Sequence, residues 1–532
     1  MTHPEPHGRS ISLACVALVL GLVPRAAAQI VVEGEAPRDD DVAFSFVPFE
    51  VPAGTVEIEV RHATLDAENI LDWGLLDPDG GFRGWGGGNT EPAIVGVEAA
   101  SRSYRAGPIA AGTWRVVIGE AKIVETPARY RVEIELRTAP TLAVDPDRSA
   151  YAPVPALAVG ARWYAGDFHV HSRESGDAQP TLDAIARFAR ERGLDFVLLS
   201  DHNTDSHVEL IVRAQARHPA LLFIPGVEYT TYAGHANGIG VTRYVDHLLG
   251  VDGATIHDAV AAIHAQGGLF SINHPRLDLG DRCIGCAWGH DVPAERVDAI
   301  EIATGGWSQS ASLFTPRVLT LWNELEATGA HVAALGGSDD HRAGTGTGSF
   351  DSPIGDPLTM VYAEALSVDA IVRGVRAGRT VVRLQGPADP MLELSAGGAM
   401  IGDVVEGPRL TLRARATGGA GSSLRFVRNG TVVEVVAIDA DPFEAELAIE
   451  APYGDAEDRW RAEIADGRTL RTITSHLYVR PQPGEPPDAG PPPAPAEPGC
   501  SCRAHEGGST RAWHAAVLLA FVVAPWRRAQ GA

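Results

Sequence analysis

Groups of the kind that bind transition metals are concentrated in short motifs in the middle of the chain. The motifs supply these imidazoles and carboxylates: His169, His171, Asp177, Asp201, His202, Glu228, His235, His274, Asp339 and His341. A set that mixes imidazole with carboxylate suits Mn, Fe or Zn better than Mg or Ca. A lone histidine is more often a hydrogen-bonded loop or core residue, but this many ligands exceed what one ion needs. The sequence therefore predicts a centre with more than one divalent ion.

The motifs occur where buried strands are expected to end. His169 and His171 are two residues apart at the end of an apolar run, so their side chains point to the same side. Asp201 directly follows the apolar run 196–199, and Glu228 directly follows another. In a barrel of parallel strands, active sites form at the carboxyl ends of the strands. The positions of the motifs therefore favour one shared site.

The region 161–387 alternates apolar strand candidates with amphipathic helices. The strand candidates are 163–170, 196–199, 221–227, 269–272, 297–302, 332–335, 358–362 and 380–384. The helix candidates are 181–193, 255–266, 319–328 and 368–376. Continuous apolar strands are what a parallel sheet buried on both faces requires. The pattern predicts an irregular, TIM-like (β/α) barrel of about seven strands.

Two regions that flank the expected barrel show the two-residue alternation of exposed and buried positions that is typical of strands. We expect a β-sandwich at 29–140, a linker at 141–160 and an immunoglobulin-like β domain at 388–480. Asn429-Gly430 between two apolar runs predicts a hairpin. Neither β region carries a cluster of reactive residues, so both are interpreted as packing, spacing or substrate-orienting modules.

The motifs HVH, SDHN, GVE, NHP and GSDDH resemble, in this order, those of the PHP superfamily. These are metal-dependent phosphoesterases related to polymerase and histidinol phosphatase domains. The GHANG element and the flanking β regions resemble the carbaryl-hydrolase-like branch of that superfamily, and the resemblance spans roughly 161–386. It implies a hydrolase in which metal ions lower the pKa of a bridging water from 15.7 toward about 7, so that a bridging hydroxide attacks the substrate.

The resemblance also implies which residues would hold each ion. A first ion would be held by His169, His171, Glu228 and Asp339. Glu228 would bridge it to a second ion held by His235 and His274, and a third would be held by Asp177, His202 and His341. The family's first-motif aspartate usually comes at the position that Gly176 occupies here, with Asp177 one residue later, so the number of ions stays at two or three.

Three residues are assigned further roles. Asp201 would orient a ligand without binding metal itself, and His341 could also act as general acid for the leaving group. Arg276, two residues after His274, could clamp an anionic substrate oxygen. An ordinary surface arginine is an equal alternative for Arg276.

The charge of the chain narrows the range of substrates. It has 68 acidic and 44 basic residues, a formal net charge of −24 at pH 7. This argues against stable nucleic-acid binding, but a cationic metal centre could still bind a small-molecule or nucleotide-like substrate. The leading hypothesis is a phosphoesterase, with nucleotides and oligonucleotides among its candidate substrates. The alternatives are a hydrolase of carboxyl or carbamate esters or amides, and a non-catalytic surface binding protein.

Both ends of the chain have the pattern of processing signals. Residues 1–28 are expected to form a signal peptide, with an apolar run and an alanine-rich cleavage site. A proline-rich linker, 481–499, precedes 500–532, which resembles the tripartite C-terminal sorting signal of myxobacterial surface proteins. This implies an exported bacterial protein, handled by the sorting machinery and anchored at the outer surface of the cell. A plain membrane tail is the alternative. In that compartment Cys283 and Cys286 could form a disulfide, remain free thiols or bind a metal ion.

Overall fold

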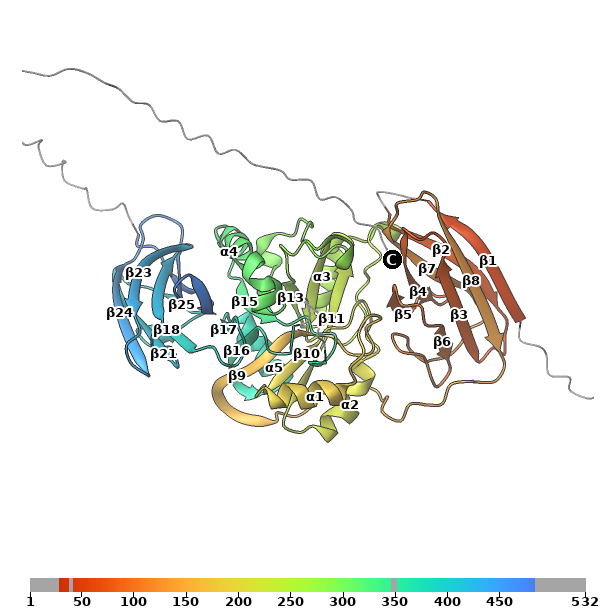
Figure 1. Ribbon diagram of the computed structural model, residues 1–532, viewed down its shortest axis with the longest axis horizontal. Helices are drawn as coiled ribbons and strands as arrows, with labels where there is room; N and C mark the ends of the chain where they lie inside the picture. The colour runs from red at the N-terminus through yellow and green to blue at the C-terminus, as the bar shows by residue number, and fades with distance from the viewer. Residues whose placement is uncertain (1–27, 38–41, 346–351, 484–532) are drawn as a thin grey trace, which may run out of the picture. The chain divides into compact units, whose positions relative to one another are not determined.

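The computed structural model describes residues 28–37, 42–345 and 352–483. Almost all of the expected signal peptide, the C-terminal sorting signal and most of the proline-rich linker lie outside the described residues. No helix within the described part of the chain is both long and apolar enough to cross a lipid bilayer. Figure 1 labels the helices and strands.

The N-terminal β region forms two antiparallel four-stranded sheets that share one core. Its strands are β1 (Ala28–Ala36), β2 (Phe44–Val51), β3 (Glu57–Thr64), β4 (Ile70–Leu76), β5 (Phe82–Gly87), β6 (Ala93–Gly96), β7 (Gly112–Lys122) and β8 (Ala128–Arg137). The sheet orders are β1-β8-β3-β6 and β2-β7-β4-β5. Because side chains alternate across each strand, Ile58 and Ile134 from one sheet meet Trp114 and Ile118 from the other, all fully buried. This is the sandwich that the alternation predicts.

The central region is built on one strongly curved sheet. Its strands are β9 (Ala158–Val170), β10 (Phe196–Leu199), β11 (Leu222–Thr231), β12 (Gly234–Ile239), β13 (Leu269–Ile272), β14 (Ala299–Thr304), β15 (Ala333–Gly337), β16 (Leu358–Leu366) and β17 (Thr380–Arg383). Five α-helices are described: α1 (Leu182–Glu191), α2 (Val208–Arg217), α3 (Ile256–Ala265), α4 (Ser312–Glu326) and α5 (Val368–Arg376). Thr181 caps α1 by accepting a hydrogen bond from Ala184 N.

The expected closed barrel is not what the strand pairing shows. The order is β15-β14-β13-β12-β11-β10-β9-β16-β17, and the path runs on into the C-terminal strands instead of returning to β15. Strands β9–β11 and β13–β15 are parallel within each set, but β12 is antiparallel to both of its neighbours because it forms a hairpin with β11. One isolated parallel bridge, Val170 to Asp340, joins the end of β9 to the segment that follows β15, the edge strand of this sheet.

The C-terminal β region is also a sandwich. Its strands are β18 (Met391–Ala396), β19 (Ala399–Met400), β20 (Val404–Val405), β21 (Arg409–Thr417), β22 (Ser423–Arg428), β23 (Thr431–Ala437), β24 (Phe443–Glu450), β25 (Asp458–Asp466), β26 (Thr469–Thr474) and β27 (Leu477–Val479). The expected hairpin is confirmed, since β22 and β23 pair across Asn429 and Gly430, both with positive φ. One sheet is β19-β18-β21-β24, and the other continues from β17 through β26, so the central sheet crosses the boundary expected near 388.

Candidate metal centre

The curvature of the sheet brings the first and last ligand motifs together. His169 and His171 lie at the end of β9, and Asp339 follows β15. His171 N donates to Asp340 O at 3.0 Å, and Asp339 N donates to His169 O at 2.8 Å. Asp339 has a φ of 58°, a left-handed conformation that is uncommon for a residue other than glycine. These backbone contacts place the Asp339 carboxylate beside both histidines.

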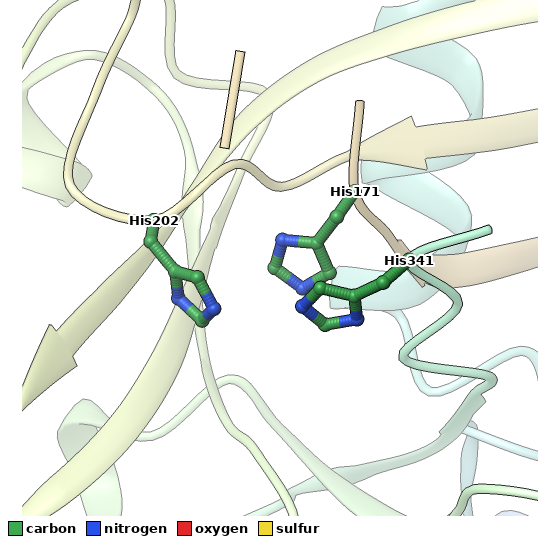
Figure 2. A group of neighbouring side chains, drawn as sticks. All are labelled: His171, His202 and His341. Atoms are coloured by element: carbon green, nitrogen blue, oxygen red, sulfur yellow. The ribbon is translucent and has the colours of Figure 1, made fainter. Parts of the chain in front are cut away.

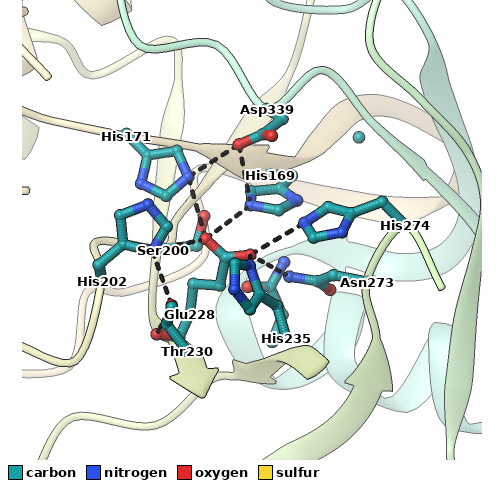
Figure 3. A network of polar contacts seen from close by, with 12 residues as sticks. His169, His171, Ser200, His202, Glu228, Thr230, His235, Asn273, His274 and Asp339 are labelled. Carbon is teal, nitrogen blue, oxygen red and sulfur yellow. Dashed lines mark hydrogen bonds and ion pairs between the residues drawn. The ribbon is translucent and has the colours of Figure 1, made fainter. Parts of the chain in front are cut away.

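Glu228 lies at the centre of the site (Figure 3). Its side chain is almost fully buried, and both of its oxygens face imidazole nitrogens. The contacts of Oε2 are His169 Nε2 at 3.2 Å, His171 Nε2 at 3.3 Å and His202 Nδ1 at 2.9 Å. The contacts of Oε1 are His274 Nε2 at 3.2 Å and His235 Nδ1 at 3.3 Å. One carboxylate therefore connects two groups of histidines, as a bridging ligand would.

The other two carboxylates contact the histidines from different sides. Asp339 Oδ1 lies 3.3 Å from His169 Nε2 and 3.0 Å from His171 Nε2. Asp177 Oδ2 lies 3.4 Å from His202 Nε2 and 3.2 Å from His341 Nε2. The structure thus brings together all nine residues that the sequence nominated as metal ligands, and Asp177 takes part despite its displaced position.

A third group of ligand atoms forms around His171, His202 and His341 (Figure 2). The ring of His171 lies 4.0 Å from that of His341 and 4.5 Å from that of His202, measured between centroids. One nitrogen from each of the three rings lies within 4.8 Å of the others. In a second group, one ligand atom from each residue also lies within 4.8 Å of the others; its members are His169, His171, Glu228 and Asp339.

Several of these buried atoms have no hydrogen bond within the described residues. They are His169 Nε2, His171 Nδ1, Glu228 Oε2 and His235 Nδ1. His169 Nε2 and His235 Nδ1 lie 3.2 and 3.3 Å from the Glu228 carboxylate without forming hydrogen bonds, and such buried polar atoms are costly unless a further group binds them. Imidazole nitrogen and carboxylate oxygen both bind Mn, Fe and Zn. The donor set and its unsatisfied atoms therefore fit divalent cations.

The electrostatics of the site favour cations. Burial opposes protonation of His169, but the carboxylates of Glu228 and Asp339 outweigh it and raise the pKa of His169 well above its ordinary value. Burial likewise opposes ionisation of Glu228, but His169 and His202 hold the pKa of Glu228 well below its ordinary value. A site that retains protons so strongly also attracts metal ions, which displace those protons when they bind.

Glu301 is a functional candidate that the sequence reasoning missed. Its Oε1 lies 3.1 Å from His169 Nδ1, and its Oε2 accepts a hydrogen bond from His274 N at 2.8 Å. Asn273 was not predicted as part of the site either, and its Nδ2 donates to Glu228 Oε1 at 3.1 Å. The signal for Glu301 was present, since it is the only charged residue in the apolar run 299–304. A lone carboxylate in a buried strand requires a partner.

The three residues with predicted catalytic roles differ in their placement. Asp201 is buried and accepts hydrogen bonds from Ser172 N and Ser172 Oγ, both at 2.6 Å, so it fixes the residue that follows His171. His341 lines the central cavity. Arg276 is exposed and does not line that cavity, and the turn formed by Leu277 N and His274 O accounts for its outward position. The clamp role for Arg276 is therefore not supported.

The ligand groups open into a cavity of about 410 Å³. Its aliphatic walls include Ile70, Leu277, Leu279 and Ile284, and no lysine or arginine is among the described residues that line it. Two further lining residues, Asp72 and Ala121, come from the N-terminal sandwich together with Ile70. Asp72 Oδ2 accepts a hydrogen bond from Tyr232 Oη at 2.8 Å. The N-terminal sandwich, interpreted from the sequence as a packing, spacing or substrate-orienting module, thus forms part of the cavity wall.

Cys283 and Cys286 form a disulfide at the edge of this cavity. The sulfur of Cys286 lies within 4.8 Å of ligand atoms of His235 and His274. A disulfide sulfur is not a thiolate, and only the thiolate binds metal strongly. The pair therefore bears on the shape of the cavity wall and not on the ligand set.

Comparison with known proteins gives likenesses in fold only. No family model and no curated protein matches the chain. A two-domain protein from Bacteroides vulgatus that contains a predicted PHP-like metal-dependent phosphoesterase is 18% identical, with a TM-score of 0.36 over 62% of this chain and 99% of that chain. An amidohydrolase from Chromobacterium violaceum is 18% identical, with a TM-score of 0.24 over 35% of this chain and 93% of that chain. At TM-scores this low, the likenesses carry no argument about activity.

Proposed function

We propose that the chain is a metal-dependent hydrolase of ester bonds, with phosphoesters as the leading class of substrate. The observation that carries the proposal is Glu228, whose two oxygens face five imidazoles. Asp339 contacts two of these rings from another side, and Asp177 contacts a third ring together with His341. This donor set suits Mn, Zn or Fe. The terminal segments of the sequence support the further proposal that the protein acts at the outer surface of a bacterial cell.

The geometry supports the following division of ligands. His169, His171, Glu228 and Asp339 would hold one ion, Glu228 with His235 and His274 a second, and Asp177 with His202 and His341 a third. When bound, such ions would lower the pKa of a water between them toward about 7 and offset negative charge on the attacked group. The contacts of Glu228 and Asp339 fix where the ligand atoms lie before any substrate arrives.

His341 is better suited to binding metal than to donating a proton. Its Nδ1 lies 2.9 Å from the backbone oxygen of Asp339, which can only accept a hydrogen bond. Nδ1 therefore carries a proton, and a metal ion would bind His341 through Nε2, the nitrogen that lies 3.2 Å from Asp177 Oδ2. This arrangement fixes the tautomer in the way that supporting carbonyls commonly do for metal-bound histidine. With a metal ion on Nε2, His341 would have no proton to give to the leaving group, which would then take its proton from water.

Charge and size support a phosphoester. Two or three dications bring more positive charge than Glu228, Asp339 and Asp177 neutralise, so an anionic group would be attracted to the centre. A cavity of about 410 Å³ is within the usual range for small-molecule ligands. A second candidate is a carboxyl or carbamate ester, because the lining has aliphatic walls and no described lysine or arginine to hold an anion.

The test uses the full chain, stripped with a chelator and reloaded with Mn²⁺ or Zn²⁺. Metal content is measured by elemental analysis, and hydrolysis of nitrophenyl phosphate, bis-nitrophenyl phosphate, a nitrophenyl ester and an aryl carbamate is followed side by side. We expect at least two ions per chain and the fastest turnover on a phosphate. Fewer than one ion per chain would refute the metal centre. Faster turnover of the ester or carbamate would establish the second candidate, and full metal content without any hydrolysis would favour a binding protein.

A further inference from the structure

The loop that carries Asp177 is held from outside the central region. Residues 171–181 form no helix or strand, and the side chain of Asp177 is 57% exposed. Apart from the imidazoles of His202 and His341, the Asp177 carboxylate contacts Ser175 Oγ at 2.8 Å. An exposed carboxylate on an irregular loop has many alternative positions. Its placement opposite two imidazoles therefore requires that the loop itself be fixed.

Arg102, in the segment between β6 and β7 of the N-terminal sandwich, provides that restraint. Its Nη1 donates to Ala178 O at 2.8 Å and more weakly to Arg173 O at 3.4 Å. Its Nη2 donates to Gly176 O at 3.0 Å. A planar guanidinium can hold several carbonyls at once because its donors diverge in a rigid fork. Arg102 therefore forms hydrogen bonds to the backbone on both sides of Asp177.

Two neighbouring contacts hold the same loop. Ser103 N donates to Glu174 Oε2 at 3.1 Å, and Ser103 Oγ donates to Glu174 O at 2.7 Å. At Gly176 the loop passes so close to Gly86 of β5 that a Cβ would overlap the Gly86 carbonyl oxygen. A side chain is therefore excluded at position 176, and Asp177 is the carboxylate that reaches the imidazoles.

We propose that Arg102 is a positioning residue of the metal centre, which acts through the loop 173–178 to present Asp177 to His202 and His341. This inference rests on the proposed function, and it makes the N-terminal sandwich a structural part of the metal centre. The site would then be incomplete without a residue that lies more than seventy positions away from Asp177 in the sequence.

The test measures metal binding by the full chain. Mn²⁺ is titrated by calorimetry into the wild type, Arg102→Ala and Arg102→Lys, with folding checked by circular dichroism and thermal unfolding. Removal of outer supporting contacts commonly weakens metal affinity about 10- to 100-fold. In Arg102→Ala we expect this loss of metal affinity at the weakest site only, with the affinities of the tighter sites unchanged. Arg102→Lys should recover part of the lost affinity. A binding curve of Arg102→Ala that matches the wild type would overturn the inference.

Arg105→Ala is the matched control. Arg105 lies in the same segment and pairs with Asp205 at 2.9 Å and Glu209 at 3.4 Å, so it also joins the sandwich to the central region, but at a different loop. This variant should bind metal as the wild type does. An equal loss in Arg105→Ala would show a general loosening of the two regions and would overturn a specific role for Arg102.

A double-mutant cycle shows whether Arg102 acts through Asp177. In an Asp177→Asn background, Arg102→Ala should change metal affinity less than about threefold, because the carboxylate that it positions is already gone. An undiminished effect in that background would refute the inference while leaving the metal centre intact. Absence of metal from the wild type would instead refute the proposed function itself.

Discussion

The Oε1 of Glu301 lies 3.1 Å from the Nδ1 of His169, on the side of the ring opposite to the nitrogen that faces the ligand group. The carboxylate therefore keeps the proton of His169 on Nδ1 and leaves Nε2 available for a metal ion. Its other oxygen accepts from His274 N, so one carboxylate orients two candidate ligands. Glu301 binds no ion in this scheme, yet the geometry of two ligands depends on it.

Glu301→Gln should weaken metal binding without removing a ligand. The amide keeps the shape of the side chain but loses the charge that stabilises the Nδ1 proton of His169. The expected loss of metal affinity is about 10- to 100-fold, measured by competition with a fluorescent chelator. Glu324→Gln, the same change at an exposed position of α4, is the control and should have no effect. Unchanged affinity in Glu301→Gln would show that the contact with His169 is dispensable.

Glu228→Gln should be the most damaging conservative change in the site. Glutamine keeps the shape of Glu228 but removes the charge that faces both groups of histidines. We expect a rate loss on the order of 10³, which corresponds to about 4 kcal/mol of barrier, together with lower metal content. Asp177→Asn should cost less, because Asp177 is more exposed and contacts only two imidazoles. Near-normal turnover of Glu228→Gln at full metal content would rule out the bridging role.

Removal of metal should lower the stability of the protein. An ion that binds only the folded chain stabilises it by about 2.7 kcal/mol when its free concentration is one hundred times its Kd. The thermal unfolding midpoint should therefore fall when EDTA is added at pH 7 and recover when excess Mn²⁺ is restored. Glu228→Gln should show a smaller shift in the midpoint. A wild-type midpoint that is insensitive to both additions would contradict a metal centre built into the fold.

The stability of the folded protein should also fall as the pH is lowered, because His247 is buried in its neutral form. His247 is buried with its ring 4.5 Å from that of Trp85 and 5.5 Å from that of Phe82, and burial lowers the pKa of His247 from 6.5 to about 3. Between these values the unfolded chain binds the proton and the folded chain does not. The contribution is therefore fully present above pH 6.5 and is lost as the pH falls toward 3.

His247→Phe should remove this part of the pH dependence. Between pH 7 and pH 5, the free energy of unfolding of the wild type should fall by about 2 kcal/mol more than that of the variant. Urea unfolding at the two pH values measures the difference. His257→Phe, at an exposed position of α3, is the control and should follow the wild type. Parallel losses in the wild type and His247→Phe would mean that His247 is not buried as described.

Local pattern predicts most strands of the central region and places the candidate ligand motifs at their ends. Apolar runs such as 196–199 and 269–272 became β10 and β13, because a strand buried on both faces needs a continuous apolar segment. His274 and Asp339 each follow a strand whose end faces the same side of the sheet, and the structure places His274 Nε2 3.2 Å from Glu228 Oε1 and Asp339 Oδ1 3.3 Å from His169 Nε2. These features depend on a few neighbouring residues, which a sequence shows directly.

Long-range pairing was harder to predict. In the sequence, the segment 234–239 shows only a ligand motif. In the structure it forms β12, which runs antiparallel to both β11 and β13. Strand pairing depends on partners far along the chain, so the expected irregular barrel is only partly confirmed: strands and helices alternate, but the sheet does not close. Arg276 was placed by its closeness to His274 in sequence, although a turn directs it away from the cavity. Asp72 and Arg102 gave no local signal, because their roles exist only where the sandwich meets the central region.

The pairing of β17 with β26 limits how this protein can be divided. The antiparallel ladder pairs Val381, Val382 and Arg383 with Thr474, Ile473 and Thr472. The sheet that carries the ligands therefore continues into the C-terminal sandwich without a break. A shortened chain that ends before β18 would expose a bare strand edge, which is a template for aggregation. The C-terminal sandwich therefore cannot be replaced as an independent domain. A recombinant form of the central region must include β26 in order to stay soluble.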